Sequence, residues 1–393
     1  MTRTVILGGA RTPFGVLGGK LKDKPAVELG ATAIRAALER TGIGPADVDN
    51  VIMGMVVQAG AGQIPSRQAS MAAGLPETVT SETINKVCAS GMRAVNLGDA
   101  LIRAGEADVV VAGGMESMSR GPGLLMDARW GRRLGHGQVL DSVIHDGLWC
   151  AFGDVHMGNH GEQMAREFNV SREEQDQWAL RSHQRALAAI DGGRMAEEIV
   201  PVEVPVRGGT ETVDTDEAPR RDTSLEKLAK LRPVFDPNGC ITAGNAPGIN
   251  DGAAALVLMN EDKARAEGFK PMVRVRSWAT AAAEPPYLAT VPHLAAEKAL
   301  AKAGLGRKDI GLVEINEAFA VVTIVSTRLG EWDPEIVNVN GGAIALGHPI
   351  GASGARIVLT LAHEMRKRGV QFGLASICSG GGQGEAIVLE LVD

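Results

Sequence analysis

Apolar residues in the first third of the chain follow two alternating periods, and this alternation predicts an α/β protein. Short apolar runs, typical of buried strands, cover residues 4–10, 48–60, a segment ending at Val87, and 107–117. Apolar residues spaced three and four apart predict helices over residues 26–42, 63–74 and 91–105. Strands and helices thus follow each other in turn, as in a sheet covered by helices.

A second series of the same kind begins at Pro271 and runs to the C-terminus. Its predicted strands cover residues 273–280, 310–316, 336–340, 372–378 and 385–392. Its predicted helices cover residues 293–304, a segment after Glu317, and 351–369. Each series contains a strand, a small-residue turn, an amphipathic helix and a strand that ends in glycines. We therefore interpret the two series as duplicated halves.

The alternation stops between Ser119 and Asn250, which separates the two series. This region contains loops, charged residues and one clear helix start, the capping box Ser171-Arg172-Glu173-Glu174. We interpret residues 119–249 as an inserted domain. The strand pattern resumes directly after it, so residues 1–118 and 250–270 are assigned to the first half and residues 271–393 to the second.

Composition and charge exclude several classes of function. The 393 residues carry a formal net charge of −7 and only 3% aromatic residues, which disfavours nucleic acid as a partner. No segment reaches the roughly 20 apolar residues of a membrane span, so we expect a cytoplasmic protein without a membrane partner. The four cysteines form no CxxC pair, which argues against a metal site.

Cys88 is the first candidate for chemistry. It lies in NKVCASGMRAV, between a predicted strand and a predicted helix. A helix N-terminus carries partial positive charge and free N–H groups, which favour a thiolate and can hold an oxyanion. A lone intracellular cysteine is more often a small apolar core residue. The position therefore singles out Cys88 as a candidate nucleophile.

Three further groups lie at junctions between a strand and a turn. His348, in GGAIALGHPIG, takes the place of the lysine of a phosphate loop and is a candidate base. Cys378 opens CSGGGQG and Asn316 opens NEAFA, although a core thiol and a helix cap are their ordinary structural interpretations. Ligands of α/β proteins bind at the carboxyl ends of strands, so these groups together with Cys88 predict one shared site.

The same stretches, together with VAGGMESMS, VHMG and TAGNAPGINDGAAA, follow one another as in the thiolases. The chain resembles this family over its whole length, and most closely the biosynthetic type. The resemblance implies a five-layered α-β-α-β-α body from the two halves, with the insertion as a loop domain that covers coenzyme A. It also implies reversible Claisen condensation of two acetyl-CoA to acetoacetyl-CoA and CoA. No cofactor is expected, because coenzyme A is substrate and product.

The resemblance also assigns roles to the candidate residues. Cys88 would accept the acyl group, His348 would activate it, and Cys378 would remove the α-proton of the second acetyl-CoA. Two oxyanion sites are implied. One consists of His348 and a water held by Asn316, and the other of the backbone N–H groups of Cys88 and Gly380.

Coenzyme A needs local positive charge on this acidic chain. Arg220, in the basic stretch of residues 220–232, is the expected phosphate contact, although such a run is often a solvated helix face. Other matched positions, expected along pantetheine and the acyl group, are Leu148, His156, Met157, Phe235, Ala243, Ala318 and Phe319. Two residues depart from the family pattern. Pro247 replaces a serine and removes a hydrogen bond, and Leu288 replaces a common methionine and leaves the acyl preference open.

Other functions share parts of this pattern. A degradative 3-ketoacyl-CoA thiolase uses the same residues on a broader range of chain lengths, so the sequence does not separate the two. A decarboxylating ketosynthase would lack a base of the Cys378 type, and a non-catalytic acyl-CoA binding protein would not need both cysteines and His348. We expect a homo-oligomer, a tetramer rather than a dimer, because Arg120 to Val143 resembles a tetramerisation loop.

Overall fold

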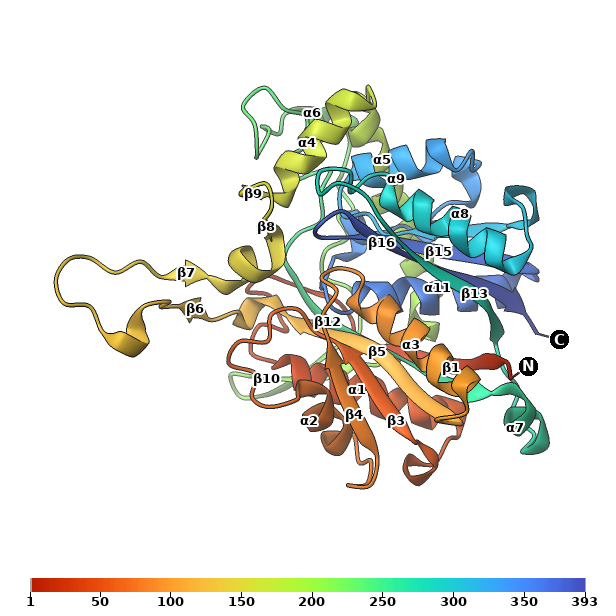
Figure 1. The fold of residues 1–393 in the computed structure, drawn as a ribbon. Helices are drawn as coiled ribbons and strands as arrows, with labels where there is room; N and C mark the ends of the chain where they lie inside the picture. Colours follow the sequence, from red (N-terminus) through yellow and green to blue (C-terminus); the bar gives the residue numbers. More distant parts are fainter. Residues whose placement is uncertain (1, 393) are drawn as a thin grey trace.

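Two similar sheet halves form the centre of the computed structural model, which describes residues 2–392 (Figure 1). In spatial order, the first half contains β1 (Thr4–Arg11), β12 (Asn250–Asn260), β5 (Val109–Ser117), β3 (Asn50–Gly54) and β4 (Thr80–Ile84), with β2 (Gly15–Val16) beside β12. The second half contains β13 (Val273–Ala282), β16 (Gln383–Leu391), β15 (Phe372–Ser379) and β14 (Leu312–Ile315). Strands β1 and β13 pair antiparallel, so the halves form one hydrogen-bonded path.

The two halves share their topology. In each, the first strand pairs antiparallel with the last, and the last pairs antiparallel with the strand before it. In each, that strand then pairs parallel with an earlier strand of the same half, β3 in the first and β14 in the second. The shared order agrees with the interpretation of the sequence as duplicated halves.

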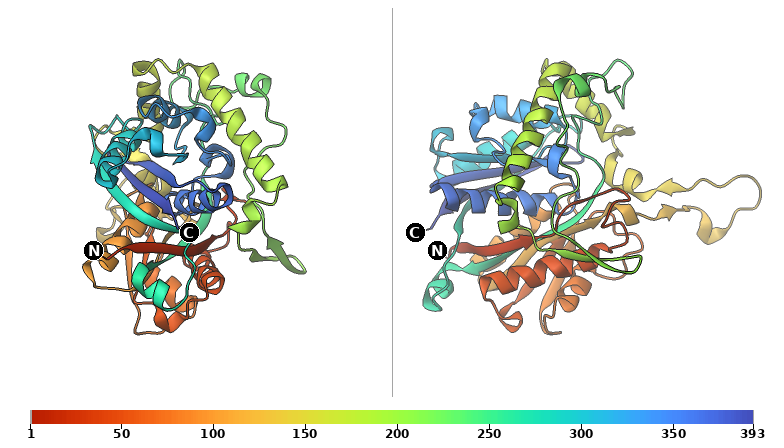
Figure 2. Two further views of the ribbon diagram at one scale, coloured as in Figure 1. Left: turned by 90° about the vertical axis from the view of Figure 1, so that its right-hand side faces the viewer. Right: turned by 180° about the vertical axis from the view of Figure 1, so that it is seen from behind.

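Helices cover both outer faces and fill the space between the halves (Figures 1 and 2). Helices α1 (Ala26–Thr41) and α2 (Pro65–Ala72) cover the first half, and α8 (Val291–Ala303), with α9 (Ala320–Leu329) beside it, covers the second. Helices α3 (Ser90–Ala104) and α11 (Ser353–Arg368) pack against each other in the middle, within one apolar core. The predicted α/β fold with five α-β-α-β-α layers is confirmed.

The predicted strand over residues 336–340 is wrong. Only an isolated bridge joins Val337 to Val313 of β14. The backbone of Asn338 has a φ of 48°, which ends an extended segment. The side chain of Asn338 instead accepts a hydrogen bond from the N–H of Ile315 and donates one to its carbonyl, both at 2.8 Å. A side-chain amide thus replaces the backbone of the expected strand.

The region between β5 and β12 carries most of the elements that the sequence did not predict. Its helices are α4 (Met157–Glu167), α5 (Arg172–Asp191), α6 (Leu225–Ala229) and a π-helical turn (Val143–Leu148). Its short strands are β6 (Gly123–Leu124), β7 (Leu140–Asp141), β8 (Trp149–Cys150), β9 (Val155–His156), β10 (Val202–Val206) and β11 (Gly209–Val213). The predicted cap of α5 is present, because Ser171 Oγ accepts a hydrogen bond from the N–H of Glu174.

The remaining elements are short and lie at connections. They are the helices α7 (Glu261–Ala266) and α10 (Ala343–Leu346) and the 3-10 turns Pro45–Asp47, Met118–Arg120, Ala128–Trp130, Met195–Glu197, Arg307–Asp309 and Pro334–Ile336. None of the helices within residues 2–392 is long and apolar enough to cross a membrane.

Buried ion pairs join the insertion to the first half. Arg11 on β1, which is fully buried, donates to Glu198 and Asp216, each at 2.7 Å. Buried charges of this kind are stable only when they are paired and hydrogen-bonded. The pairs therefore hold the insertion in a fixed place beside the sheet.

Candidate active site

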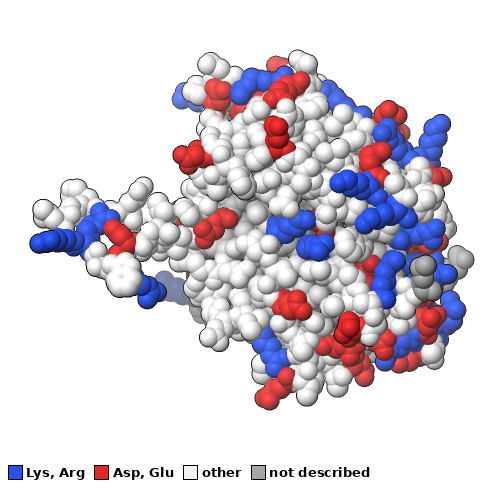
Figure 3. Space-filling model, viewed as in Figure 1, with Lys and Arg blue, Asp and Glu red and all other residues white. Residues whose placement is uncertain are grey.

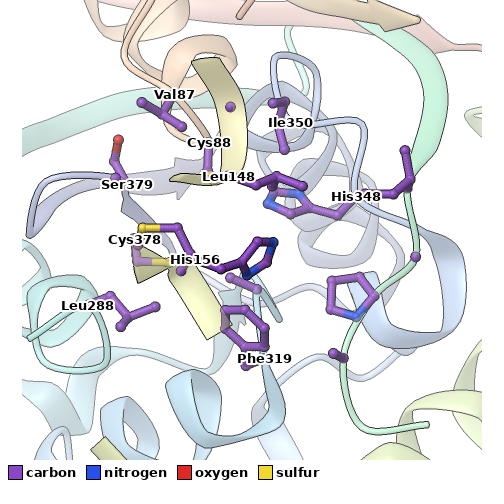
Figure 4. A pocket seen from close by; sticks show the side chains of 18 of the residues that line it. Val87, Cys88, Leu148, His156, Leu288, Phe319, His348, Ile350, Cys378 and Ser379 are labelled. Atoms are coloured by element: carbon purple, nitrogen blue, oxygen red, sulfur yellow. The ribbon is translucent and has the colours of Figure 1, made fainter. Parts of the chain in front are cut away.

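The predicted site residues lie around one cavity where the two halves meet the insertion (Figure 4). The cavity has a volume of about 310 Å³. Cys88, His348, Cys378 and Gly380 all line it. Of the residues matched to pantetheine or the acyl group, the lining includes Leu148, His156, Met157, Phe235, Pro247, Ala318 and Phe319. The fold thus brings together groups that are as far apart in the sequence as Cys88 and Gly380.

Cys88 lies in a tight turn rather than at the first residue of the helix. Strand β4 ends at Ile84 and helix α3 begins at Ser90, two residues after Cys88. The preceding residue, Val87, has a φ of 44°. A positive φ is rare for a β-branched residue and costs on the order of 1–3 kcal/mol. The turn that presents Cys88 is therefore strained, as is common beside reacting groups.

The environment of Cys88 favours the thiol over the thiolate. Burial, with a smaller contribution from Glu116, raises the pKa of Cys88 to about 12. The expectation that the helix start stabilises a thiolate in the resting protein is therefore wrong. The physical reason is that desolvation of the charged sulfur outweighs the nearby N–H groups. Attack by this sulfur consequently needs a base that takes its proton.

His348 has the protonation state of such a base. Its Nδ1 lies 2.6 Å from Ser353 Oγ, and that hydroxyl donates its only proton to the Pro349 carbonyl at 2.9 Å. Ser353 can therefore only accept from His348, which places the imidazole proton on Nδ1. The lone pair is left on Nε2, which is buried and has no partner among residues 2–392. Burial, with Arg356 nearby, lowers the pKa of His348 to about 3, so the ring is neutral.

Cys378 is the next-to-last residue of strand β15 and lines the same cavity. Burial, together with the neighbouring Cys88, raises the pKa of its thiol well above the usual range. The next residues turn sharply, and a Cβ atom on Gly380 would lie 3.3 Å from Val87. The N–H groups of Cys88 and Gly380 have no acceptor within residues 2–392. Two free donors on adjoining segments suit an oxyanion at the cavity wall.

Asn316 lies directly after β14 and behind the cavity lining rather than in it. Its side chain is fully buried, yet neither Oδ1 nor Nδ2 has a partner among residues 2–392. Buried amides are normally satisfied by protein or by ordered water. The geometry therefore fits an amide that holds a water molecule.

Stacked rings form the cavity wall to which the insertion contributes His156 and Phe235. The rings of His156 and Phe235 are 4.6 Å apart and nearly parallel, and Phe319 meets Phe235 edge-on. Burial lowers the pKa of His156, which favours its neutral form. Leu288 and Pro247, which depart from the family pattern, also line the cavity. Pro247 has no N–H and no hydroxyl, so it offers a ligand only apolar contact and a carbonyl.

Two predicted coenzyme A contacts lie outside the cavity lining. Ala243 and Arg220 are exposed, and the backbone N–H of Arg220 donates to His183 on α5. Within the basic stretch, three side chains pair with acids: Arg221 with Asp191, Lys227 with Asp222 and Lys230 with Glu226. Only Arg220 and Arg232 in this stretch lack an acidic partner among residues 2–392.

Several buried side chains that support the site were missed from the sequence. Glu116 accepts hydrogen bonds from the N–H groups of Val56, Val57 and Gly351, and burial raises the pKa of its carboxyl to about 7. Glu116 could have been identified from the sequence, because it is a charged residue near the end of an otherwise apolar strand.

The loop of His348 has two more supports of this kind. Asn250 Oδ1 accepts from the N–H of His348 at 2.8 Å. Glu317 accepts from Trp178, Ser182, Asn338 and the N–H of Ile344. These contacts join segments distant in sequence, so no local pattern reveals them.

Comparisons with known proteins agree with this geometry. Residues 4–262 match the family described as the thiolase N-terminal domain, and residues 269–391 match the thiolase C-terminal domain. The chain is 51% identical to an acetyl-CoA acetyltransferase of Escherichia coli K12 over 392 residues, and 50% identical to one of Pseudomonas aeruginosa over 390 residues. Each alignment covers 99% of both chains. The crystal structure of the Bacillus anthracis acetyl-CoA acetyltransferase, 42% identical, superposes with a TM-score of 0.98 over 100% of this chain and 99% of that one.

Proposed function

The chain belongs to the thiolase family, and from this premise we propose that it is an acetyl-CoA C-acetyltransferase. It would catalyse the reversible condensation of two acetyl-CoA to acetoacetyl-CoA and CoA through an acyl-Cys88 intermediate. The observation that carries the proposal is the convergence of Cys88, His348 and Cys378 on one cavity. A non-catalytic acyl-CoA binding protein would not need three such groups together.

In the first step, the sulfur of Cys88 attacks the acetyl-CoA carbonyl while His348 Nε2 takes its proton. The raised pKa of Cys88 and the lowered pKa of His348 make the thiol and neutral imidazole the resting pair. The carbon–sulfur bond to CoA then breaks, and Cys378 gives its proton to the departing CoA thiolate. This leaves acyl-Cys88, a protonated His348 and a Cys378 thiolate.

In the second step, the Cys378 thiolate removes the α-proton of a second acetyl-CoA. The resulting enolate attacks the acyl-Cys88 carbonyl, and the bond between that carbon and the Cys88 sulfur breaks. His348 returns its proton to Cys88, so all three groups regain their starting forms. Each proton is accounted for by a side chain of this protein.

Negative charge forms on a thioester oxygen in both steps, and two donor sets are available for it. The free N–H groups of Cys88 and Gly380 suit the tetrahedral intermediate on Cys88. Protonated His348, with a water held by the unpaired amide of Asn316, suits the enolate. Because side chains, N–H groups and this water suffice for each step, the proposal includes no cofactor besides coenzyme A as substrate and product.

Coenzyme A would enter across the wall formed by the insertion. The stacked His156 and Phe235, with Met157, Leu148 and Phe319, offer an apolar channel for pantetheine. Arg220 has no acidic partner in the described chain and remains the proposed phosphate contact, and Ala243, which is also exposed in the insertion, remains a proposed contact of coenzyme A. The free cysteines fit the proposed cytoplasmic location, because the chemistry needs both thiols reduced.

Thiolysis rates test the proposed substrate against the degradative alternative. The cavity is small, at about 310 Å³, and its lining includes the bulky side chains of Leu288 and Phe319, so we expect acetoacetyl-CoA to be cleaved at least tenfold faster than 3-ketoacyl-CoA of eight carbons or more. Steady-state kcat/KM values for both substrates provide the measurement. Equal or faster cleavage of the long substrate would favour a degradative enzyme of broad chain length.

We propose a homotetramer, and the supporting feature is a long arm between β6 and β7 (Figures 1 and 2). The arm exposes large apolar side chains, with Trp130 at 89% and Leu134 at 95% exposure. In the space-filling view the arm projects from the body and carries several basic groups (Figure 3). Apolar groups displayed in this way are typical of an interface. Strand β4, at the edge of the sheet, offers a second surface for another copy.

Shortening the arm should reduce the assembly from tetramers to dimers. Residues 126–138 can be replaced by Asn-Gly, because β6 and β7 are paired at Leu124 and Leu140 and a tight turn can join them. Light scattering after size exclusion gives the mass. As a control, Val206→Ser removes an exposed apolar group from the β10–β11 hairpin and should leave the mass unchanged. A tetramer with the shortened arm would rule out this interface.

A further inference from the structure

One side-chain hydrogen bond joins the two segments that carry the cavity cysteines. Ser379 Oγ, next to Cys378, donates to the backbone carbonyl of Lys86 at 2.6 Å. Lys86 precedes Cys88 by two residues. Ser379 is 1% exposed, and its side chain is directed toward the segment that carries Val87 (Figure 4). The bond thus connects the second half of the molecule to the first at the edge of the cavity.

The Lys86 end of this bond is held in place independently. Lys86 Nζ pairs with Glu385 Oε2 at 2.5 Å, and Glu385 is fully buried on β16. Glu385 also accepts from Asn96 at 2.9 Å and from Arg93 at 3.4 Å. Because β16 is paired with β15, the strand that carries Cys378, Lys86 is fixed relative to that strand twice, through its side chain and through its carbonyl.

The bond also acts next to strained backbone. Val87 keeps its φ of 44° with its N–H bound to Asn85 Oδ1 and its carbonyl bound by Ser90 Oγ. A strained conformation persists only where the surroundings fix it. The Val87–Cys88 peptide determines the direction of the Cys88 N–H. A shift of Lys86 would therefore turn that N–H relative to the cavity.

We propose that Ser379 is a positioning residue, whose hydrogen bond to the Lys86 carbonyl sets the N–H of Cys88 relative to the N–H of Gly380. The close approach of Gly380 to Val87 shows that the two segments adjoin. This inference rests on the proposed function, in which those N–H groups bind the oxyanion on Cys88. It adds a residue to that site that acts through the backbone rather than on the substrate.

Ser379→Ala is the test variant. We expect acetylation of Cys88 by acetyl-CoA to slow about tenfold or more, since loss of a whole oxyanion donor costs about a hundredfold to a thousandfold. KM for acetyl-CoA should stay within about twofold. Alkylation of Cys88 by iodoacetamide forms no oxyanion, so its rate should also stay within about twofold of wild type. If Ser379 only stabilised the fold, Ser379→Ala would change the rates of acetylation and alkylation alike.

Ser277→Ala is the matched control. Ser277 is a buried serine in the same half, on β13, and its hydroxyl donates to the Ala299 carbonyl at 2.7 Å. Both variants lose the same kind of bond, so similar thermal unfolding is expected, whereas only Ser379→Ala should acylate slowly. Lys86→Met provides a second variant. It removes the ion pair with Glu385 but keeps the bond from Ser379, so it should show a selective loss of the same kind and smaller size.

The outcomes separate the proposals. Unchanged acylation in Ser379→Ala would overturn the positioning role. A parallel loss of acylation and alkylation would also overturn it, because the effect would then lie on the thiol or its base. Equal losses in the Ser277→Ala control would overturn it as well. If Ser379→Ala does not fold, Ser379→Gly, which also lacks the hydroxyl, takes its place: normal acylation by the folded variant overturns the role, and a selective loss supports it. Failure of the wild-type protein to acylate would instead contradict the proposed function.

Discussion

Cys378→Ala is expected to slow condensation of acetyl-CoA about a hundredfold or more while acetylation of Cys88 stays within about tenfold of wild type. Acetylation relies mainly on the Cys88 sulfur and the lone pair of His348, whose Nε2 has no other partner in the described chain. Cys378 assists acetylation only by protonating the departing CoA thiolate, which accounts for the smaller loss expected in that step. Condensation additionally needs a base for the α-proton. Cys378, buried beside Cys88, is the group proposed for that task.

The two half-reactions can be measured separately. Acetyl-enzyme is quantified by intact mass after brief mixing with acetyl-CoA, and condensation is followed by acetoacetyl-CoA formation. Cys150→Ala is the matched control, because Cys150 is also buried but does not line the cavity. Equal losses of both half-reactions in Cys378→Ala would show that the two cysteines do not divide the chemistry.

His348→Ala is expected to impair both half-reactions, with acetylation of Cys88 falling about a thousandfold. With a pKa of about 12, Cys88 is almost entirely a thiol at neutral pH and depends on the imidazole to lose its proton. Without this base, the rate at which Cys88 reacts depends on the fraction of its sulfur that is present as thiolate. At pH values below the pKa, this thiolate fraction rises about tenfold for each unit by which the pH increases. Alkylation of Cys88 in the variant should therefore climb steeply from pH 7 to pH 10.

Two variants accompany this measurement. His293→Ala removes a half-buried histidine on α8, outside the cavity lining, and should acylate normally. The acylation rate of Ser353→Ala should lie between those of wild type and His348→Ala. This variant keeps the imidazole ring but removes the hydroxyl that fixes its tautomer. A His348→Ala protein that acylates at the wild-type rate would remove His348 from the role of base.

Local patterns predicted where most of the chemistry lies, because Cys88, Cys378 and Asn316 lie at or just after strand ends, whereas His348 follows the short helix α10. Cys378 is the next-to-last residue of β15 and Asn316 follows β14, and the fold brings such strand ends to one cavity. The electrostatics of Cys88 could not be predicted in this way. The pKa of Cys88 depends on burial by segments that are distant in sequence. That burial raises the pKa, whereas the position near a helix start was expected to lower it.

Interactions between distant residues account for the other differences. Side-chain hydrogen bonds between Asn338 and Ile315 are found where a strand was predicted, and the spacing of apolar residues does not indicate them. The supports of His348, namely Ser353 and Asn250, are also invisible in a local pattern. In the insertion, α4 packs against other segments, and the strands are only two to five residues long, so neither shows a strong period of its own. Only its capped helix α5 was predictable.

Acetylation of Cys88 is the most direct test of the account. The wild-type protein is mixed with acetyl-CoA, quenched in acid and digested, and the peptides are analysed by mass spectrometry. The account predicts an acetyl group on the peptide that contains Cys88, its loss when free CoA is added before the quench, and none in Cys88→Ala. An acetyl group on a different residue, or one that persists in Cys88→Ala, would contradict the claim that Cys88 carries the intermediate.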